Sequence, residues 1–284
     1  MLLNLIRKGI PLLIILMAAA SWQPVYGQAR RTSALEDQWP RYSLEAGFYA
    51  TNINSNFRLG AERLGIGLEI NFEDALGLNT SSLTVTGNFL YRFSKNRRSA
   101  MQVSYFQISR KASKTLEANL EIRDTVFTAG TTLGTKFTLS VVQLDYCYSI
   151  LLDDRVNLYA SFGFYVVPLS FSFNRDDKRS EKSDFTAPLP NLGFGTYIYL
   201  TPKLLIIQRL NVLYLKVPNY EGGMTDIHVG LEYQPWKRFA FGAGYNAFNI
   251  NIEATKDATL LVGDLIGNIG YKQNGLIVYA AVNF

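Results

Sequence analysis

The sequence predicts an all-β fold, an antiparallel up-and-down transmembrane β-barrel with about ten strands. Three observations favour this fold. Apolar residues recur at every second position, which is the period of a strand with one apolar and one polar face. Beyond an apolar stretch near the N-terminus no run is long enough for a membrane helix, although 48% of the residues are hydrophobic. The segment 276–284 alternates in the same way and ends on Phe284.

A basic and then apolar leader opens the sequence. Arg7 and Lys8 precede an apolar stretch, Ile10 to Ala20, that is shorter than the roughly 17–25 residues of a membrane-spanning helix. Small residues such as Gly27 follow, and this order is typical of a secretory signal peptide. We therefore expect a cleaved signal peptide over 1–27, a short periplasmic N-terminal segment over 28–41 and the barrel over 42–284.

The segment 156–164 illustrates the strands. Leu158, Phe162 and Phe164 fall on one face, and Asn157 and Ser161 fall on the other. In a barrel wall the apolar face contacts lipid and the polar face lines the lumen. The same pattern recurs in 83–92, 226–233 and 239–247. A soluble β-sandwich is the alternative, and it leaves the terminal aromatic residue without a reason.

Connection lengths predict the topology. Short connections at 94–98, 151–155, 201–203 and 235–237 alternate with longer polar segments at 110–135, 174–188 and 216–223. Such barrels have short periplasmic turns and longer outer loops. If 58–72 and 255–271 are strand extensions and hairpins above the membrane, the barrel has ten strands. Twelve and eight strands remain as alternatives.

Aromatic residues near the short turns predict a girdle at the membrane interface, where Tyr and Trp are favoured. These are Tyr91, Phe93, Tyr146, Tyr148, Tyr199, Tyr233 and Trp236.

The leader, the alternating strands and Phe284 together resemble the small monomeric outer-membrane β-barrel proteins of Gram-negative bacteria. The resemblance implies an exported monomer in the outer membrane, with membrane lipid and lipopolysaccharide as partners. It also implies that the barrel assembly machinery recognises the chain through Phe284. Lys178, Arg179 and Lys182 are candidates for contacts with lipopolysaccharide phosphates. The net charge of +5 is too small to indicate nucleic-acid binding.

Ionisable residues on the inward faces predict a charge network in the lumen. A charge inside a membrane barrel is stable only when it is paired or hydrated. One interpretation is a structural network that closes the lumen, and the other is a narrow polar pore. We expect Arg92 or Arg209 to bridge carboxylates of neighbouring strands. The network comprises Glu45, Glu69, Arg92, Asp145, Arg209, Asp226, His228 and Glu232.

Catalysis has one candidate pair, Asp226 and His228, which share a face two residues apart. The pair resembles the Asp-x-His half of the omptin outer-membrane proteases, and a surface hydrolase just below the loop at 216–223 is the alternative function. Omptins also need an Asp-x-Asp motif, which this sequence lacks. Barrel lipid hydrolases need a serine beside the histidine, and no convincing partner stands there. We therefore expect no catalytic activity, no cofactor and no metal. We expect Cys147 to be a small buried residue.

Overall fold

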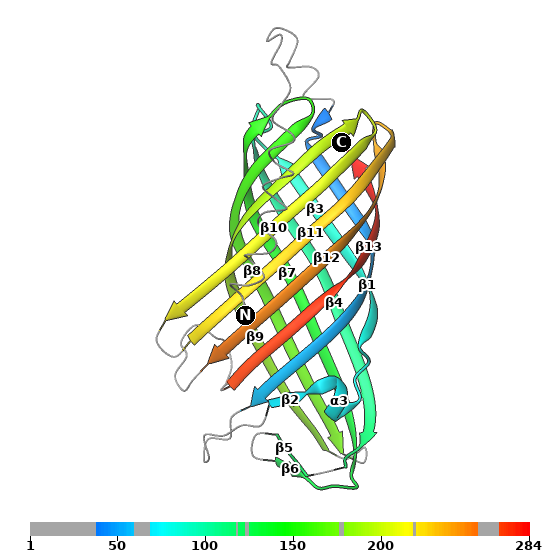
Figure 1. The fold of residues 1–284 in the computed structure, drawn as a ribbon, viewed down its shortest axis with the longest axis vertical. Helices are drawn as coiled ribbons and strands as arrows, with labels where there is room; N and C mark the ends of the chain where they lie inside the picture. Colours follow the sequence, from blue (N-terminus) through cyan, green and yellow to red (C-terminus); the bar gives the residue numbers. More distant parts are fainter. Residues whose placement is uncertain are drawn as a thin grey trace.

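The computed structural model describes residues 38–59, 69–117, 119–122, 125–175, 179–217, 220–254 and 267–284. Within them, ten long antiparallel strands form one closed up-and-down barrel (Figure 1). The alternatives of eight and twelve strands are therefore wrong. The barrel strands are β1 (Tyr42–Leu59), β3 (Ser81–Arg92), β4 (Ser99–Thr115), β7 (Thr132–Leu152), β8 (Val156–Arg175), β9 (Arg179–Thr201), β10 (Leu204–Val217), β11 (Tyr220–Trp236), β12 (Phe239–Ala254) and β13 (Gly267–Asn283).

The barrel closes between its first and last strands. β1 pairs with β13 from Ser43 opposite Asn283 to Leu59 opposite Gly267. The amide of Tyr42 donates a hydrogen bond to the carbonyl of Phe284 over 3.0 Å, and the amide of Phe284 donates one to the carbonyl of Tyr42 over 2.9 Å. Closure removes unpaired sheet edges from the turn-end half, which a strand must avoid in lipid, whereas further towards the loop end β9 and β10 pair no further than Leu192 opposite Val212. No helix in the described residues is long and apolar enough to cross a membrane.

The two ends of the barrel differ. All four short connections predicted from the sequence lie at the end that also holds Tyr42 and Phe284, which we call the turn end; it is at the top of Figure 1. The opposite end, which we call the loop end, holds β2 (Glu69–Asn71), α3 (Phe72–Leu76) and the hairpin of β5 (Leu120–Ile122) with β6 (Thr125–Phe127). The predicted signal peptide and most of the 28–41 segment lie outside the described residues.

Exposed apolar side chains form a band around the half of the barrel nearest the turn end. On β11 the band runs from Ile227 to Trp236, which matches the roughly 9–11 residues that a tilted strand needs to cross a bilayer. The faces that the sequence assigned to lipid are the exposed ones. We call this surface the apolar band, and its members include Leu44, Phe48, Leu83, Val85, Phe89, Phe162, Phe164, Leu192, Phe194, Val229, Leu231, Phe241, Leu276 and Val278.

Towards the loop end the polarity of both faces is reversed. On β4, Val103 and Tyr105 are exposed apolar residues of the band, but Lys111 further along the same face is an exposed cation. The inward face changes from Gln102 to Ile108, which is fully buried. The loop-end half is therefore built like a water-soluble β-protein, with polar residues outside and an apolar core inside. This core, the distal core, includes Ile53, Phe72, Leu76, Ile108, Leu133, Phe137, Leu139, Val167, Phe173, Phe248, Ile250 and Tyr271.

This reversal corrects the predicted outer loops at 110–135, 174–188 and 216–223. Strands continue to Thr115, Arg175 and Val217 and resume at Thr132, Arg179 and Tyr220. The described outward residues of the extensions of β4 and β7, such as Lys111, Ser113 and Lys136, are exposed and polar, so in sequence they resemble loops. The side chains of 175–188, including Lys178, Arg179 and Lys182, lie outside the described residues.

A short helix begins at the end of the segment 58–72, for which the sequence predicts a strand extension or hairpin. The side chain of Asn71 caps the start of α3 by accepting a bond from the amide of Asp74, and Gly77 ends it with a φ of 70°. Phe72 and Leu76 of this helix belong to the distal core. The remaining parts of the two predicted hairpins, 60–68 and 255–266, lie outside the described residues.

Candidate functional site

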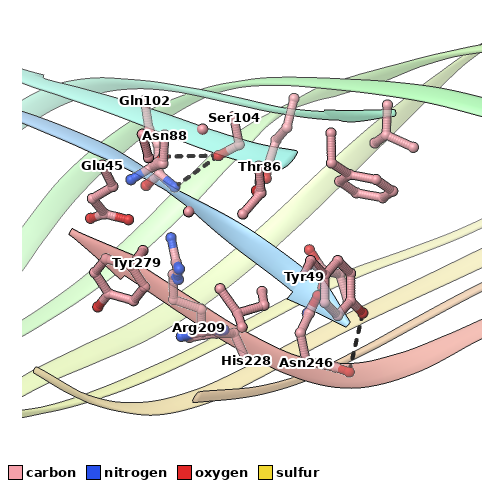
Figure 2. A pocket seen from close by; sticks show the side chains of 18 of the residues that line it. Glu45, Tyr49, Thr86, Asn88, Gln102, Ser104, Arg209, His228, Asn246 and Tyr279 are labelled. Carbon is pink, nitrogen blue, oxygen red and sulfur yellow. Dashed lines mark hydrogen bonds between the residues drawn. The ribbon is translucent and has the colours of Figure 1, made fainter. Parts of the chain in front are cut away.

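The polar lumen inside the apolar band is the candidate site. A cavity of about 80 Å³ is lined by side chains from most of the surrounding strands. Figure 2 shows Glu45 from β1, Arg209 from β10, His228 from β11 and Tyr279 from β13 around this space. A cavity of this size has room for a few water molecules.

Strand register and small residues position these side chains. Arg209 lies opposite His228 on β11, and His228 lies opposite Asn246 on β12. Position 242 requires glycine, because the ring of Tyr279 occupies the space that a Cβ atom would need. Glycine in strands is expected where another group approaches the backbone this closely.

Asp226 is held by neutral donors. The hydroxyl of Tyr165 donates to its Oδ2 over 2.8 Å, and the Nδ2 of Asn246 donates to its Oδ1 over 2.6 Å. Asn211 in turn donates to the Tyr165 hydroxyl over 3.1 Å. Both carboxylate oxygens therefore have partners other than the histidine.

His228 shares the inward face with Asp226, as the sequence predicted, but the structure does not join them into a catalytic pair. His228 is 5% exposed, and its Nε2 atom has no hydrogen-bond partner within the described part of the chain. The pair was expected just below the outer loop at 216–223. It lies instead in the closed lumen, with the distal core between it and the loop end.

The other lumen carboxylates are also bound by neutral groups. Tyr279 donates to Oε2 of Glu232 over 3.0 Å, and Gln234 donates to Oε1 over 2.8 Å. Gln143 donates to Oδ2 of Asp145 over 2.6 Å. Glu45 lines the cavity. The side chain of Glu69 lies outside the described residues.

The arginines do not make the predicted bridges. Arg92 donates to the carbonyl of Pro40 over 2.9 Å and stacks 5.8 Å from the ring of Trp39. Among the described residues neither Arg92 nor Arg209 has a carboxylate within ion-pair distance. Alternation predicts which side chains face inward, but their height along the barrel axis depends on strand register, which alternation does not reveal.

A buried ion pair that sequence reasoning missed lies in the loop-end half. The Nη1 atom of Arg110 is 2.5 Å from Oε1 of Glu73, and the two side chains are only 2% and 5% exposed. Ser55 donates from its hydroxyl to the same carboxylate over 2.6 Å and accepts from Arg110 over 3.0 Å. Arg110 lies in the segment predicted as a loop, although Ile108, Arg110 and Ala112 continue the inward alternation of β4. The pair fixes α3 inside the barrel mouth.

Trp39 closes the turn end. It is 2% exposed, and its indole nitrogen donates to the carbonyl of Asp153 over 2.6 Å. Tyr199 packs against it at 5.3 Å and donates to the carbonyl of Gln38 over 3.3 Å. Tyr199 therefore faces the lumen and does not belong to the predicted girdle, because strand alternation places Leu200 outside instead. Phe93, Tyr148, Tyr233 and Trp236 are exposed near the turn end, and Tyr91 and Tyr146 are partly so.

Metal ligands are not clustered in the described residues, where no group of three or more His, Cys, Asp or Glu side chains is suited to hold an ion. Cys147 is buried and unpaired.

Comparison with known proteins shows the fold. No family model and no curated protein sequence matches this chain. Among solved structures, the outer membrane protease OmpT from Escherichia coli is similar with a TM-score of 0.50 and 9% identity, over 85% of this chain and 97% of that one. Ail of Yersinia pestis matches over 85% of this chain and 99% of its own, with 12% identity and a TM-score of 0.37. The Pseudomonas putida toluene transporter TodX matches over 88% and 92%, with 8% identity and a TM-score of 0.36. At these identities the likeness extends to the barrel fold alone.

Proposed function

We propose that this chain is an integral outer-membrane protein whose barrel is closed to solutes and whose role is structural, without catalysis. One observation carries the proposal: the polar lumen is covered at both ends by packed side chains. The distal core and α3 fill the loop-end half, and Trp39 fills the turn end. The apolar band supports insertion into a bilayer, and the barrel fold is that of an outer-membrane protein.

The contacts of the lumen charges favour a structural role over a pore. Asp226, Glu232 and Asp145 are each bound by Tyr, Asn or Gln side chains at 2.6–3.0 Å. A pathway for ions needs continuous water along the axis, and the cavity of about 80 Å³ holds only a few molecules.

Conductance in planar bilayers tests the closed lumen. We expect no single-channel current from the protein. A conducting porin reconstituted in the same bilayers provides the positive control. Regular current steps from the unaltered protein would contradict a closed barrel.

Membrane insertion is tested separately. The folded protein should migrate faster on gels without heating than after boiling, and it should fractionate with the outer membrane. Phe284 is exposed at the end of the last strand, and the assembly machinery is expected to recognise it. Phe284→Asp should therefore lower the yield of the fast-migrating form far more than Lys272→Gln near the loop end. Recovery as a soluble periplasmic protein would refute insertion.

The absence of catalysis is tested through His228. We expect neither peptide nor lipid hydrolysis above background from the protein, because the histidine is buried and its Nε2 atom has no hydrogen-bond partner within the described residues. A hydrolytic activity that His228→Asn abolished while the barrel still folded would establish the alternative, a surface hydrolase.

A further inference from the structure

The turn end carries a repeated feature. Each strand that starts there is immediately preceded by an arginine or a lysine. Lys and Arg together make up 28 of the 284 residues, so composition alone does not explain a cation at every one of these positions. The cations are Arg41 before β1, Arg98 before β4, Arg155 before β8, Lys203 before β10 and Arg238 before β12.

These five residues, which we call the basic rim, occupy equivalent places in the sheet. The carbonyl of each accepts a backbone hydrogen bond of 2.7–2.8 Å from the neighbouring strand that runs towards the turn end. The five donors are the amides of Arg92, Ser149, Tyr199, Gln234 and Asn283. The rim therefore lies at one level of the barrel. Its members are two strands apart, which corresponds to a separation of about 10 Å.

The charge at this level is predominantly positive. Lys95, Arg97 and Lys237 lie in the same turns as the basic rim, against Asp153, Asp154 and the C-terminal carboxylate. Asp153 uses its Oδ1 atom to accept from the amides of Arg155 and Val156, so it stabilises its own turn.

Several of these cations lack a protein partner. Arg155, Lys203 and Arg238 are exposed, and among the described residues none has a carboxylate within ion-pair distance. The buried Nε and Nη1 atoms of Arg97 have no hydrogen-bond partner in the described part of the chain. The exposed side chains of Arg155, Lys203 and Arg238, in contrast, are free to donate to phosphate oxygens at a membrane surface.

Exposed aromatic residues stand directly beside the basic rim, on the bilayer side. Tyr42 follows Arg41, and Phe239 follows Arg238; they are 39% and 49% exposed. A shallow depression is lined by Trp236, Lys237, Arg238 and Phe239, two rings and two cations. Aromatic side chains at the interface contact the upper acyl chain and glycerol region, and the adjacent cations then reach the phosphate level.

We propose that the basic rim binds the headgroup phosphates of anionic phospholipids in the periplasmic leaflet. This proposal rests on the proposed insertion in the outer membrane with the turn end facing the periplasm. Anionic lipid is the occupant that fits best, because the cations form a ring at one level and adjoin the apolar band on every side. The ring fixes the depth and the orientation of the barrel in the bilayer.

The experiment compares two charge-matched variants of the full chain, folded in detergent micelles. Arg155→Gln, Lys203→Gln and Arg238→Gln remove three charges from the basic rim. Lys111→Gln, Lys136→Gln and Lys272→Gln remove three exposed charges near the loop end and serve as the control. The readouts are the thermal unfolding temperature and native mass spectrometry with added phosphatidylglycerol or, at matched chain length, phosphatidylcholine.

We expect phosphatidylglycerol to raise the unfolding temperature of the unaltered protein and of the control more than phosphatidylcholine does. The rim variant should lose this difference, with affinity weaker on the order of 100-fold for three cations. Equal shifts with both lipids, or a full shift in the rim variant, would overturn the proposal. The proposal would also be overturned if the rim variant lost binding to purified cell-wall sacculi but kept the full rise in unfolding temperature with phosphatidylglycerol. Because binding is measured in micelles, a failure here is distinct from a failure of insertion or closure.

Discussion

Replacing Arg110 by methionine should strongly destabilise the barrel. Arg110 forms an ion pair with Glu73 at 2.5 Å. It also donates hydrogen bonds to the Ser55 hydroxyl over 3.0 Å and to the carbonyl of Asn79 over 3.1 Å. Methionine fills a similar volume but leaves the Glu73 carboxylate buried with only the amide and hydroxyl of Ser55 as partners. Breaking a buried ion pair in this way costs about 3–5 kcal/mol.

The assay is urea unfolding of the folded barrel in lipid vesicles, followed by the gel mobility of the folded form. The double variant Arg110→Met with Glu73→Gln removes both charges, and it should regain at least half of the lost stability, because an uncharged replacement avoids the unpaired carboxylate. Lys216→Gln breaks an exposed pair with Glu221 and is the matched control, with little change expected. An Arg110→Met variant as stable as the unaltered protein, or a double variant no better than the single, would refute this reasoning.

Two further variants and one titration test other features. Gly242→Val should destabilise the barrel by about 1–3 kcal/mol, because the new side chain overlaps the Tyr279 ring, whereas Gly87→Ala, which has room, should be tolerated in the same urea assay. The pKa of Glu221 lies below its ordinary value because Lys216 donates a hydrogen bond to it, so Lys216→Gln should raise the Glu221 midpoint in an NMR titration. The small stabilising contribution of the Lys216–Glu221 pair is present above the ordinary pKa of a glutamate, and it is lost as the pH falls through the lowered pKa of Glu221. An unchanged midpoint would show that the two side chains do not interact in solution.

The sequence contained enough information for the strands and their faces, because a period of two is a local property. Phe162 and Val229 face outward and Asn157 and His228 face inward, as alternation predicted. The four short turns and the count of ten strands followed from connection lengths.

The contacts within the lumen did not follow from the sequence. Which inward residues meet depends on strand register around the whole barrel, so Arg92 stacks on Trp39 where a carboxylate was expected. Alternation places Asp226 on the correct face, but it does not reveal that its partners are Asn246 of the next strand, β12, and Tyr165 of the more distant β8.

The loop-end half was missed for two reasons. Its strands carry polar residues outside, so Lys111 and its neighbours resembled a loop. Helix α3 has a single turn and is held by packing, which a helix of that length needs because nucleation is unfavourable. Asn71 and Gly77 are residues typical of helix caps, but they also occur in turns, so they do not by themselves predict a helix between them.

The reversed polarity of the loop-end half determines how far the protein reaches from the cell. β9 has 23 residues, and about 9–11 suffice for the bilayer. At about 3.3 Å per residue and a tilt near 40°, the remainder rises about 30–35 Å above the hydrocarbon. In the proposed orientation this length traverses the sugar layer of the outer leaflet. A molecule approaching from outside therefore first meets these strand extensions, and the apolar distal core lies between it and the charged residues of the lumen.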